Sequence, residues 1–195
     1  VMPHRLRLAE RSDGASVIDA RIRQFLGGQR DLFAASVDDL RTFRLADRGG
    51  IWWVTYQQYV DGLPVLDARL DLRLNENGDL LLVRDRTIRD LAVPGPGLTA
   101  IEAERIAAGY LEGRGVIVAG LAPPIAGIED CGPTAEVIVP VWSDDAGQYQ
   151  AHRAFRVRHD ATGPSRARFR SYVDATDGSL LSRTNEIAYV QAEGT

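Results

Sequence analysis

The residues best suited to metal or nucleophilic chemistry are one cysteine, Cys131, and three histidines, His4, His152 and His159. His152 and His159 stand seven residues apart in one predicted strand, and this odd separation places their side chains on opposite faces of a sheet. Cys131 follows Asp130, whose carboxylate disfavours the thiolate that nucleophilic catalysis needs. The His-Glu-x-x-His sequence of a zinc protease does not occur. We therefore predict a non-catalytic protein without a metal site or a cofactor.

Arginine side chains form a second candidate site. Arg156 and Arg158 alternate along one predicted strand, and Arg168 and Arg170 alternate along the next. If these strands form a hairpin through residues 160–165, the four guanidinium groups line one surface. Two interpretations remain open: a solvated strand face whose charge is offset by neighbouring carboxylates, or a docking surface for an acidic protein partner.

Composition limits the classes of function. The chain has 195 residues, 45% of them hydrophobic and 26% charged, which is usual for a globular protein of one or two domains. A net charge of −4 argues against nucleic acid as a partner. We expect no membrane span, because no apolar run approaches the roughly 20 residues that a spanning helix requires. The N-terminus lacks the apolar core of a signal peptide.

The first half of the chain predicts a helix followed by a sheet. Residues 16–26 carry apolar side chains at three- and four-residue spacing, which is typical of an amphipathic helix. Residues 52–85 hold three runs of strand-like pattern, separated by turns at Asp61-Gly62 and Asn77-Gly78. Adjacent Trp52 and Trp53 must face opposite sides, so we expect one in the core and take Trp53 as a candidate partner contact.

The second half repeats this outline after a boundary at residues 94–97, Pro-Gly-Pro-Gly. Thr99 and Glu102 form a capping-box pattern that opens a helix, and strand-like runs follow, ending in a hairpin at Asp177-Gly178. The sequence therefore predicts an α+β fold of two cystatin-like modules, each an α-helix packed on an antiparallel sheet. Their predicted bounds are 1–93 and 98–190, with 94–97 as a linker.

Residues 56–65, Tyr-Gln-Gln-Tyr-Val-Asp-Gly-Leu-Pro-Val, resemble the Q-x-Y-x-G-x-P-V core of fungalysin/thermolysin propeptide (FTP) domains. The matching positions are Gln57 or Gln58, Tyr59, Gly62, Pro64 and Val65. In the second half, residues 98–103 and 172–181 are similar to a PepSY-type module, whose final hairpin reads Y-V-D-A-x-T-G-x-V/I-L. The chain departs from that hairpin, since an aspartate stands before the glycine and one spacer residue is missing.

The resemblance implies a propeptide of a secreted zinc metalloprotease. Such a propeptide acts as an intramolecular chaperone and inhibitor that covers the active-site cleft. The implied partner is a catalytic domain in cis, C-terminal to this region, and the implied location is secreted or in the cell envelope. The partner-binding residues that we predict are Gln58, Tyr59, Gly62, Pro64, Trp53, Arg156, Arg158, Arg168, Arg170, Asn185 and Glu186.

Two questions stay open at this point. The motif residues of 58–64 are either a scaffold, since Gly62 and Pro64 set a turn, or direct partner contacts. The tail from Asn185 onward is expected to run toward the cleft of the protease. The alternative function is a standalone exported module that binds peptides or envelope components without a protease partner.

Overall fold

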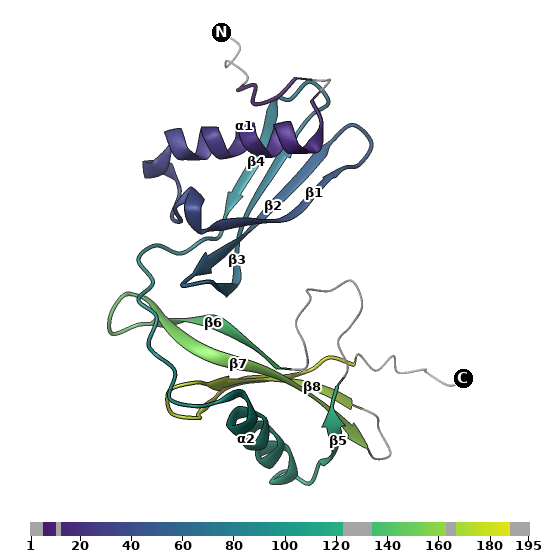
Figure 1. Cartoon of the computed structure of the whole chain (residues 1–195), viewed down its shortest axis with the longest axis vertical. Helices are drawn as coiled ribbons and strands as arrows, with labels where there is room; N and C mark the ends of the chain where they lie inside the picture. Colours follow the sequence, from purple (N-terminus) through teal and green to yellow (C-terminus); the bar gives the residue numbers. More distant parts are fainter. Residues whose placement is uncertain (1–5, 11–12, 123–133, 163–166, 188–195) are drawn as a thin grey trace, which may run out of the picture. The chain divides into compact units, whose positions relative to one another are not determined.

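The computed structural model describes residues 6–10, 13–122, 134–162 and 167–187. The chain divides into two compact units, one of residues 1–91 with 143–149 and the other of residues 92–142 with 150–195. The described residues contain nine strands and two α-helices (Figure 1). The module bounds predicted from the sequence, 1–93 and 98–190 with the linker 94–97, stay a prediction.

The predicted fold class is wrong. The described residues are mostly β-structure, with nine strands and only two short α-helices of 14 and 13 residues. Two cystatin-like modules, each a helix on its own antiparallel sheet, therefore do not describe the architecture. The physical reason is that a period of two identifies a strand by its faces, whereas the sheet that a strand joins depends on its edges, which side-chain pattern does not encode.

The first unit contains one α-helix, four strands and two 3₁₀ turns: α1 (Ala15–Gly28), η1 (Arg30–Leu32), η2 (Val37–Asp39), β1 (Leu40–Asp47), β2 (Trp52–Val60), β3 (Leu63–Leu74) and β4 (Leu80–Asp85). The strands β1, β2, β3 and β4 pair successively and antiparallel. Strand β1 was not expected from the sequence.

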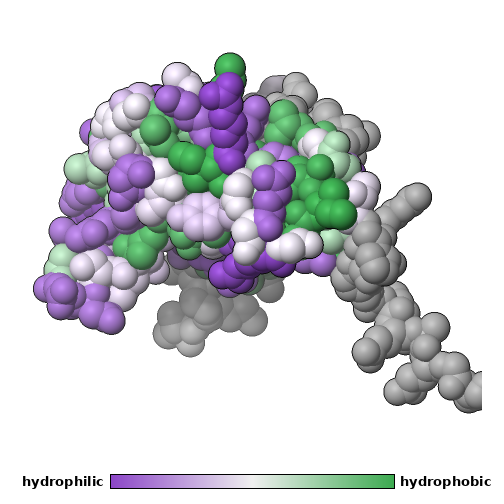
Figure 2. Space-filling model, turned by 90° about the horizontal axis from the view of Figure 1, so that it is seen from below, coloured by the Kyte–Doolittle hydropathy of each residue, from purple (hydrophilic) through white to green (hydrophobic). Residues whose placement is uncertain are grey.

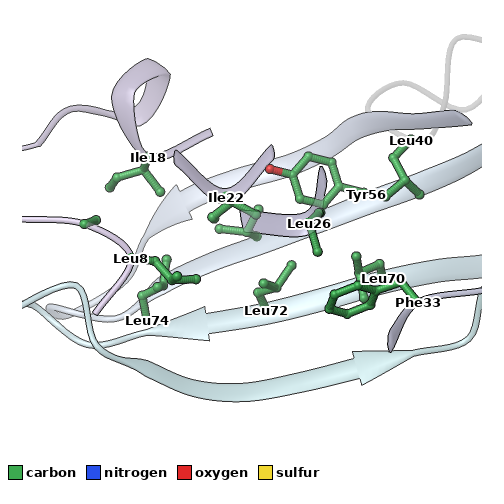
Figure 3. Packing of buried hydrophobic residues seen from close by; sticks show 12 residues of the cluster. Leu8, Ile18, Ile22, Leu26, Phe33, Leu40, Tyr56, Leu70, Leu72 and Leu74 are labelled. Carbon is green, nitrogen blue, oxygen red and sulfur yellow. The ribbon is translucent and has the colours of Figure 1, made fainter. Parts of the chain in front are cut away.

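The apolar side of α1 packs on the apolar face of this part of the sheet (Figure 3). Ile18, Ile22 and Leu26 recur every four residues along α1, so they lie on one stripe and are buried. Alternate residues of β2 and β3 face them, including Val54, Tyr56, Leu70, Leu72 and Leu74. Each fully buried Leu or Ile stabilises the fold by about 1.5–3 kcal/mol. The prediction that this helix covers the meander is confirmed.

A two-residue turn joins β2 to β3 and explains part of the motif. Asp61 and Gly62 have φ values of 51° and 79°, and a hairpin turn with two residues at positive φ matches the twist of the strands that it joins. Gly62 is therefore required by backbone conformation. Pro64 pairs with Tyr59 directly after the turn.

The second unit contains the other helix and five strands: α2 (Ala100–Glu112), β5 (Ile117–Leu121), β6 (Thr134–Ser143), β7 (Gln148–Thr162), β8 (Ala167–Asp174) and β9 (Leu180–Asn185). The predicted capping box of α2 is confirmed, since Thr99 and Glu102 bond each other's backbone N–H. Strand β7 pairs antiparallel with β5 and with β8, and β8 pairs with β9. Ala103 and Ala107 of α2 pack on Phe155 and Val173.

Neither α-helix in the described part of the chain combines the length and apolar character needed to span a membrane. Within those same residues, no group of three or more His, Cys, Asp or Glu side chains is arranged to hold a metal ion. His4 and Cys131 lie outside the described residues.

Candidate binding surfaces

Gln58 fixes the segment that follows β4. Its side chain is buried, with 2% exposure. Its Nε2 donates to the carbonyl of Ile88 at 2.7 Å, and its Oε1 accepts from the N–H of Ile88 at 2.8 Å. Because both ends of the amide are used in this pair, Gln58 holds residue 88 as a neighbouring strand would. Its role in the described residues is to position the chain.

Gln57, the other glutamine that matches the motif, satisfies the backbone at an irregularity of β3. Its Nε2 donates to the carbonyls of Val65 at 2.5 Å and of Ala68 at 3.0 Å, and its Oε1 accepts from Arg69 at 3.1 Å. Asp67 lies between these carbonyls with φ of 58°, where the strand bends. The glutamine thus compensates for lost ladder hydrogen bonds.

Tyr59, Pro64 and Trp53 are partly exposed and Gly62 is exposed, whereas Val65 is buried. The guanidinium of Arg41 lies 4.0 Å from the centre of the Tyr59 ring, and that of Arg73 lies 3.6 Å from the centre of the Trp53 ring. Each aromatic ring is therefore held in place by a cation. Trp52, by contrast, packs against the core of the first unit, so the expected opposition of the two tryptophans is confirmed.

A pocket of about 410 Å³ lies within the first unit, next to Gln58. Its apolar wall includes Leu26, Phe33, Val60 and Ile88, and charged side chains of both signs also line it: Arg30, Asp39, Arg89 and Asp90. The size falls within the range of about 300–1,000 Å³ that is usual for ligand sites. Sequence reasoning missed this pocket, because its lining comes from three separate segments, residues 26–39, 58–60 and 88–91.

In the second unit, the register of β7 and β8 brings the predicted arginines together. Arg158 lies opposite Arg170, Asp160 lies opposite Arg168, and Arg156 lies opposite Tyr172. Residues an even number apart on a strand share a face, so all four arginines project from one side of the sheet. The predicted hairpin is confirmed, although residues 163–165 of its expected turn lie outside the described residues.

Glu186 lies among these arginines, just beyond the end of β9. One carboxylate oxygen is 2.9 Å from Nε of Arg170, and the other is 3.5 Å from Nε of Arg158. The backbone N–H of Glu186 also donates to the carbonyl of Arg168 at 2.6 Å. We call Arg156, Arg158, Arg168, Arg170 and Glu186 the arginine face.

The arginine face is partly buried. Arg156 and Arg158 have exposures of 5% and 3%, whereas Arg168 and Arg170 are half-buried. The guanidinium of Arg168 donates two hydrogen bonds to the carboxylate of Asp160, at 2.9 and 3.4 Å, and this contact raises the pKa of Arg168. Nη1 of Arg158 has no hydrogen-bond partner in the described part of the chain. Of the four arginines, Arg168 and Arg170 are thus the two that a partner can reach.

The two described histidines take separate roles. Nδ1 of His152 lies 2.7 Å from Oδ2 of Asp174. His159 is buried, and burial lowers the pKa of its imidazole, against the opposing effect of Glu104 and Glu112. Their odd spacing places them on opposite faces of β7, as predicted.

Asn185 completes the end of β9. Its Oδ1 accepts from the N–H of Ile187 at 3.1 Å, a local turn that needs no partner protein. The tail beyond residue 187 lies outside the described residues.

Sequence reasoning also missed a polar cluster beneath α1. Asp19 accepts from the hydroxyl of Tyr56, from Thr42 and from Arg23, each at 2.9 Å. A signal was present in the sequence, because Asp19 and Arg23 stand four residues apart on a helix, where opposite charges pair. Their meeting with Tyr56 requires the tertiary structure.

Comparison with known proteins gives no family. No family model matches the chain, and no curated protein matches it. Among solved structures, the chain is similar to the Bacillus megaterium YpeB C-terminal domain, at 11% sequence identity and a TM-score of 0.41, over 92% of this chain and 68% of that chain. A similarity at this level carries no conclusion about function.

Figure 2 shows one face of the molecule, on which the described hydrophobic residues do not form a single area. Hydrophobic residues lie in several separate groups between hydrophilic ones (Figure 2). The exposed apolar residues of α2 and β5 include Ile101, Tyr110, Ile117 and Leu121. Single exposed apolar side chains are usual on protein surfaces, so we assign no binding role to these residues.

Proposed function

We propose that this chain is the non-catalytic propeptide of a secreted thermolysin- or fungalysin-like zinc metalloprotease, which helps the protease to fold and inhibits it by covering the active-site cleft. The observation that carries the proposal is the arginine face, where cationic side chains and the end of the last described strand meet. The resemblance of residues 56–65 to an FTP core supports the same assignment.

The arginine face suits docking of an acidic partner that is attached to the same chain. Arg168 and Arg170 are half-buried and held by carboxylates, so their guanidinium groups are oriented before a partner arrives. Glu186 fixes the chain beside them. A catalytic domain linked beyond this point would therefore bind at high effective concentration, and moderate contacts would suffice for inhibition.

Inhibition tests the proposal directly. We would titrate a thermolysin-like protease, preferably the one encoded next to this chain, with the purified 195-residue protein. We expect saturable inhibition that disappears after the inhibitor itself is digested. Arg170→Glu should weaken inhibition about tenfold or more, because it places a carboxylate against Glu186 and against an acidic partner.

The matched control is Arg114→Glu. Arg114 is an exposed arginine in the same unit, outside the arginine face. This variant has the same net charge as Arg170→Glu. A difference in inhibition between the two variants therefore reports the position of the substitution and not the total charge. A folded protein that leaves the protease fully active would contradict the propeptide function.

A second candidate is a standalone exported module that binds peptides. The pocket beside Gln58 favours it, because its apolar wall and charges of both signs match a peptide side chain and its main chain. Absence of protease inhibition, together with saturable peptide binding that a pocket-filling Ala34→Phe variant abolishes, would establish this second function.

A further inference from the structure

His159 lies on the side of β7 that α2 covers. Phe155 and Val157 of β7 pack on Ala103 and Ala107 of α2. His159 follows Val157 by two residues on the same strand, so its side chain leaves the same face. Only 4% of His159 is exposed. The imidazole therefore continues an apolar stripe that packs under the helix.

The strands on either side of β7 give the imidazole apolar neighbours. His159 pairs with Leu121 of β5 and with Phe169 of β8. Nδ1 of His159 is buried and has no hydrogen-bond partner in the described part of the chain. Protonation makes both ring nitrogens donors, so Nδ1 would then carry a proton and part of a positive charge without an acceptor. These surroundings suit the neutral imidazole and disfavour the imidazolium.

Two carboxylates of α2 act against this preference. Glu104 and Glu112 favour the imidazolium electrostatically, but burial outweighs them, so the pKa of His159 lies below its usual 6.5. Glu104 also accepts a hydrogen bond from Oγ1 of Thr134 at 2.6 Å. The carboxylates thus reduce the cost of charging the imidazole without cancelling it.

The other described elements bring further charges of both signs to this side. Strand β5 has no charged residue, and the residues of β8 that share this side are uncharged. On β9, the guanidinium of Arg183 lies 5.7 Å from the centre of the Phe169 ring. On β6, Glu136 binds Arg153 of β7 at 2.7 Å, six residues before His159. The residues directly before and after His159 project from the opposite face of β7: Arg158 and Asp160.

We propose that His159 is an acid-sensitive switch: when its imidazole takes up a proton, α2 loosens from the strands that it covers. This inference goes beyond the proposed function and does not depend on it. A buried charge must be paired or hydrated, and water reaches the buried ring when the helix moves away. The switch is therefore built into the packing of the second unit.

Acidification should open this packing in a defined range of pH. The imidazole has its ordinary pKa, about 6.5, where the packing is open, and a lower pKa where it is closed. Well above pH 6.5 neither form is protonated, so the equilibrium between them is constant. As pH falls from 6.5 toward the lower pKa, the open form binds the proton first, and its population rises by up to about tenfold per pH unit.

Amide hydrogen exchange of the full chain, followed by NMR, measures this opening. Rates corrected for the intrinsic pH dependence of exchange are compared at about pH 7 and about pH 5. Ala107 and Leu111, which are buried residues of α2, should exchange about threefold faster or more at the lower pH. Ile22 and Leu26 of α1 are the internal control, because the described part of the first unit contains no histidine.

Three variants separate His159 from other titrating groups. His159→Gln has no proton to take up in this range, so the acceleration in α2 should disappear. His152→Gln removes the other described imidazole and should leave the acceleration in place, which makes it the matched control. Glu112→Gln removes a carboxylate that favours the imidazolium, so the imidazole of His159 should titrate at a lower pH.

Two results would overturn the proposal. One is corrected exchange in α2 that is the same at both pH values. The other is an acceleration of equal size in His159→Gln. If His159→Gln does not fold, NMR titration of the Cε1–H signal of His159 in the wild-type chain decides. A midpoint below 6.5 supports the switch, and a midpoint at or above 6.5 overturns it.

Discussion

Removing the hydroxyl of Tyr56 should destabilise the first unit by about 2 kcal/mol. The ring is fully buried, and its hydroxyl donates to Oδ1 of Asp19 at 2.9 Å. A hydrogen bond to a charged group contributes about 1.5–3 kcal/mol. Tyr56→Phe keeps the ring and creates little cavity, and Asp19 retains Thr42 and Arg23 as donors, so the loss falls in the lower part of that range.

The effect of Tyr56→Phe should depend on pH. Burial tends to raise the pKa of Asp19, but hydrogen bonds from Arg23, Tyr56 and Thr42 outweigh it, so the pKa lies below the usual 3.8. A carboxyl whose pKa is lowered by folding stabilises the protein above its unfolded value and loses this contribution as pH falls through its folded value. Burial and then Asp19 raise the pKa of Tyr56 itself, so its hydroxyl stays protonated throughout.

Urea unfolding followed by tryptophan fluorescence measures the change, because Trp52 and Trp53 lie in the first unit. The difference in unfolding free energy between wild type and Tyr56→Phe should be complete at pH 7 and shrink below about pH 3.8. The control is Tyr172→Phe, at a buried tyrosine whose hydroxyl makes no side-chain hydrogen bond within the described part of the chain. A loss below about 0.5 kcal/mol, or one that is equal at pH 7 and pH 2.5, would refute the reasoning.

Three further changes test the fold. Gly62 and Gly78 both have φ of 79°, but a Cβ added to Gly62 meets open space, whereas one added to Gly78 meets the backbone of Ala9. In urea unfolding, Gly62→Ala should therefore lower the unfolding free energy by about 1 kcal/mol, and Gly78→Ala should lower it clearly more. Equal losses would contradict the contact between Gly78 and Ala9. Thr99→Ala should cost about 1 kcal/mol through the lost cap, and Thr99→Ser should restore most of it, as calorimetry can show. Gln58→Met should lower the unfolding free energy by about 3 kcal/mol, because the carbonyl and the N–H of Ile88 both lose their hydrogen-bond partner. Amide hydrogen exchange at Ile88 should become faster. Unchanged exchange would show that Gln58 does not hold this segment in place.

The sequence predicted best those elements whose pattern is local. The alternation in β2 and β3, the two hairpin turns and the capping box of α2 all appear where expected. Each is set by residues within a few positions of one another, so little tertiary information is needed. Strand β1 was missed because Leu40 alone among its residues is buried, and a strand with one buried side chain shows no period of two.

The joining of strands into a sheet could not be predicted in this way. All the strand runs expected in the second half exist, yet the prediction of two separate helix-on-sheet modules was wrong. The pocket beside Gln58 was hidden for a related reason, since residues 26–39 and 88–91 meet there without any pattern that links them. Contacts between distant segments depend on strand edges and loops, and hydrophobic periodicity carries no information about either.

For the arginine face, the period of two predicted the side of the sheet but not the burial of each side chain. Spacing alone placed Arg156, Arg158, Arg168 and Arg170 on one face, and the register confirms it. Spacing could not show that the first two would be buried and the last two half-buried. The difference changes the experiment, because a charge reversal at buried Arg158 places a carboxylate beside Glu186 where solvent cannot screen the repulsion, which confounds folding with binding. Docking is therefore better tested at the half-buried Arg168 and Arg170, where solvent screens part of that repulsion.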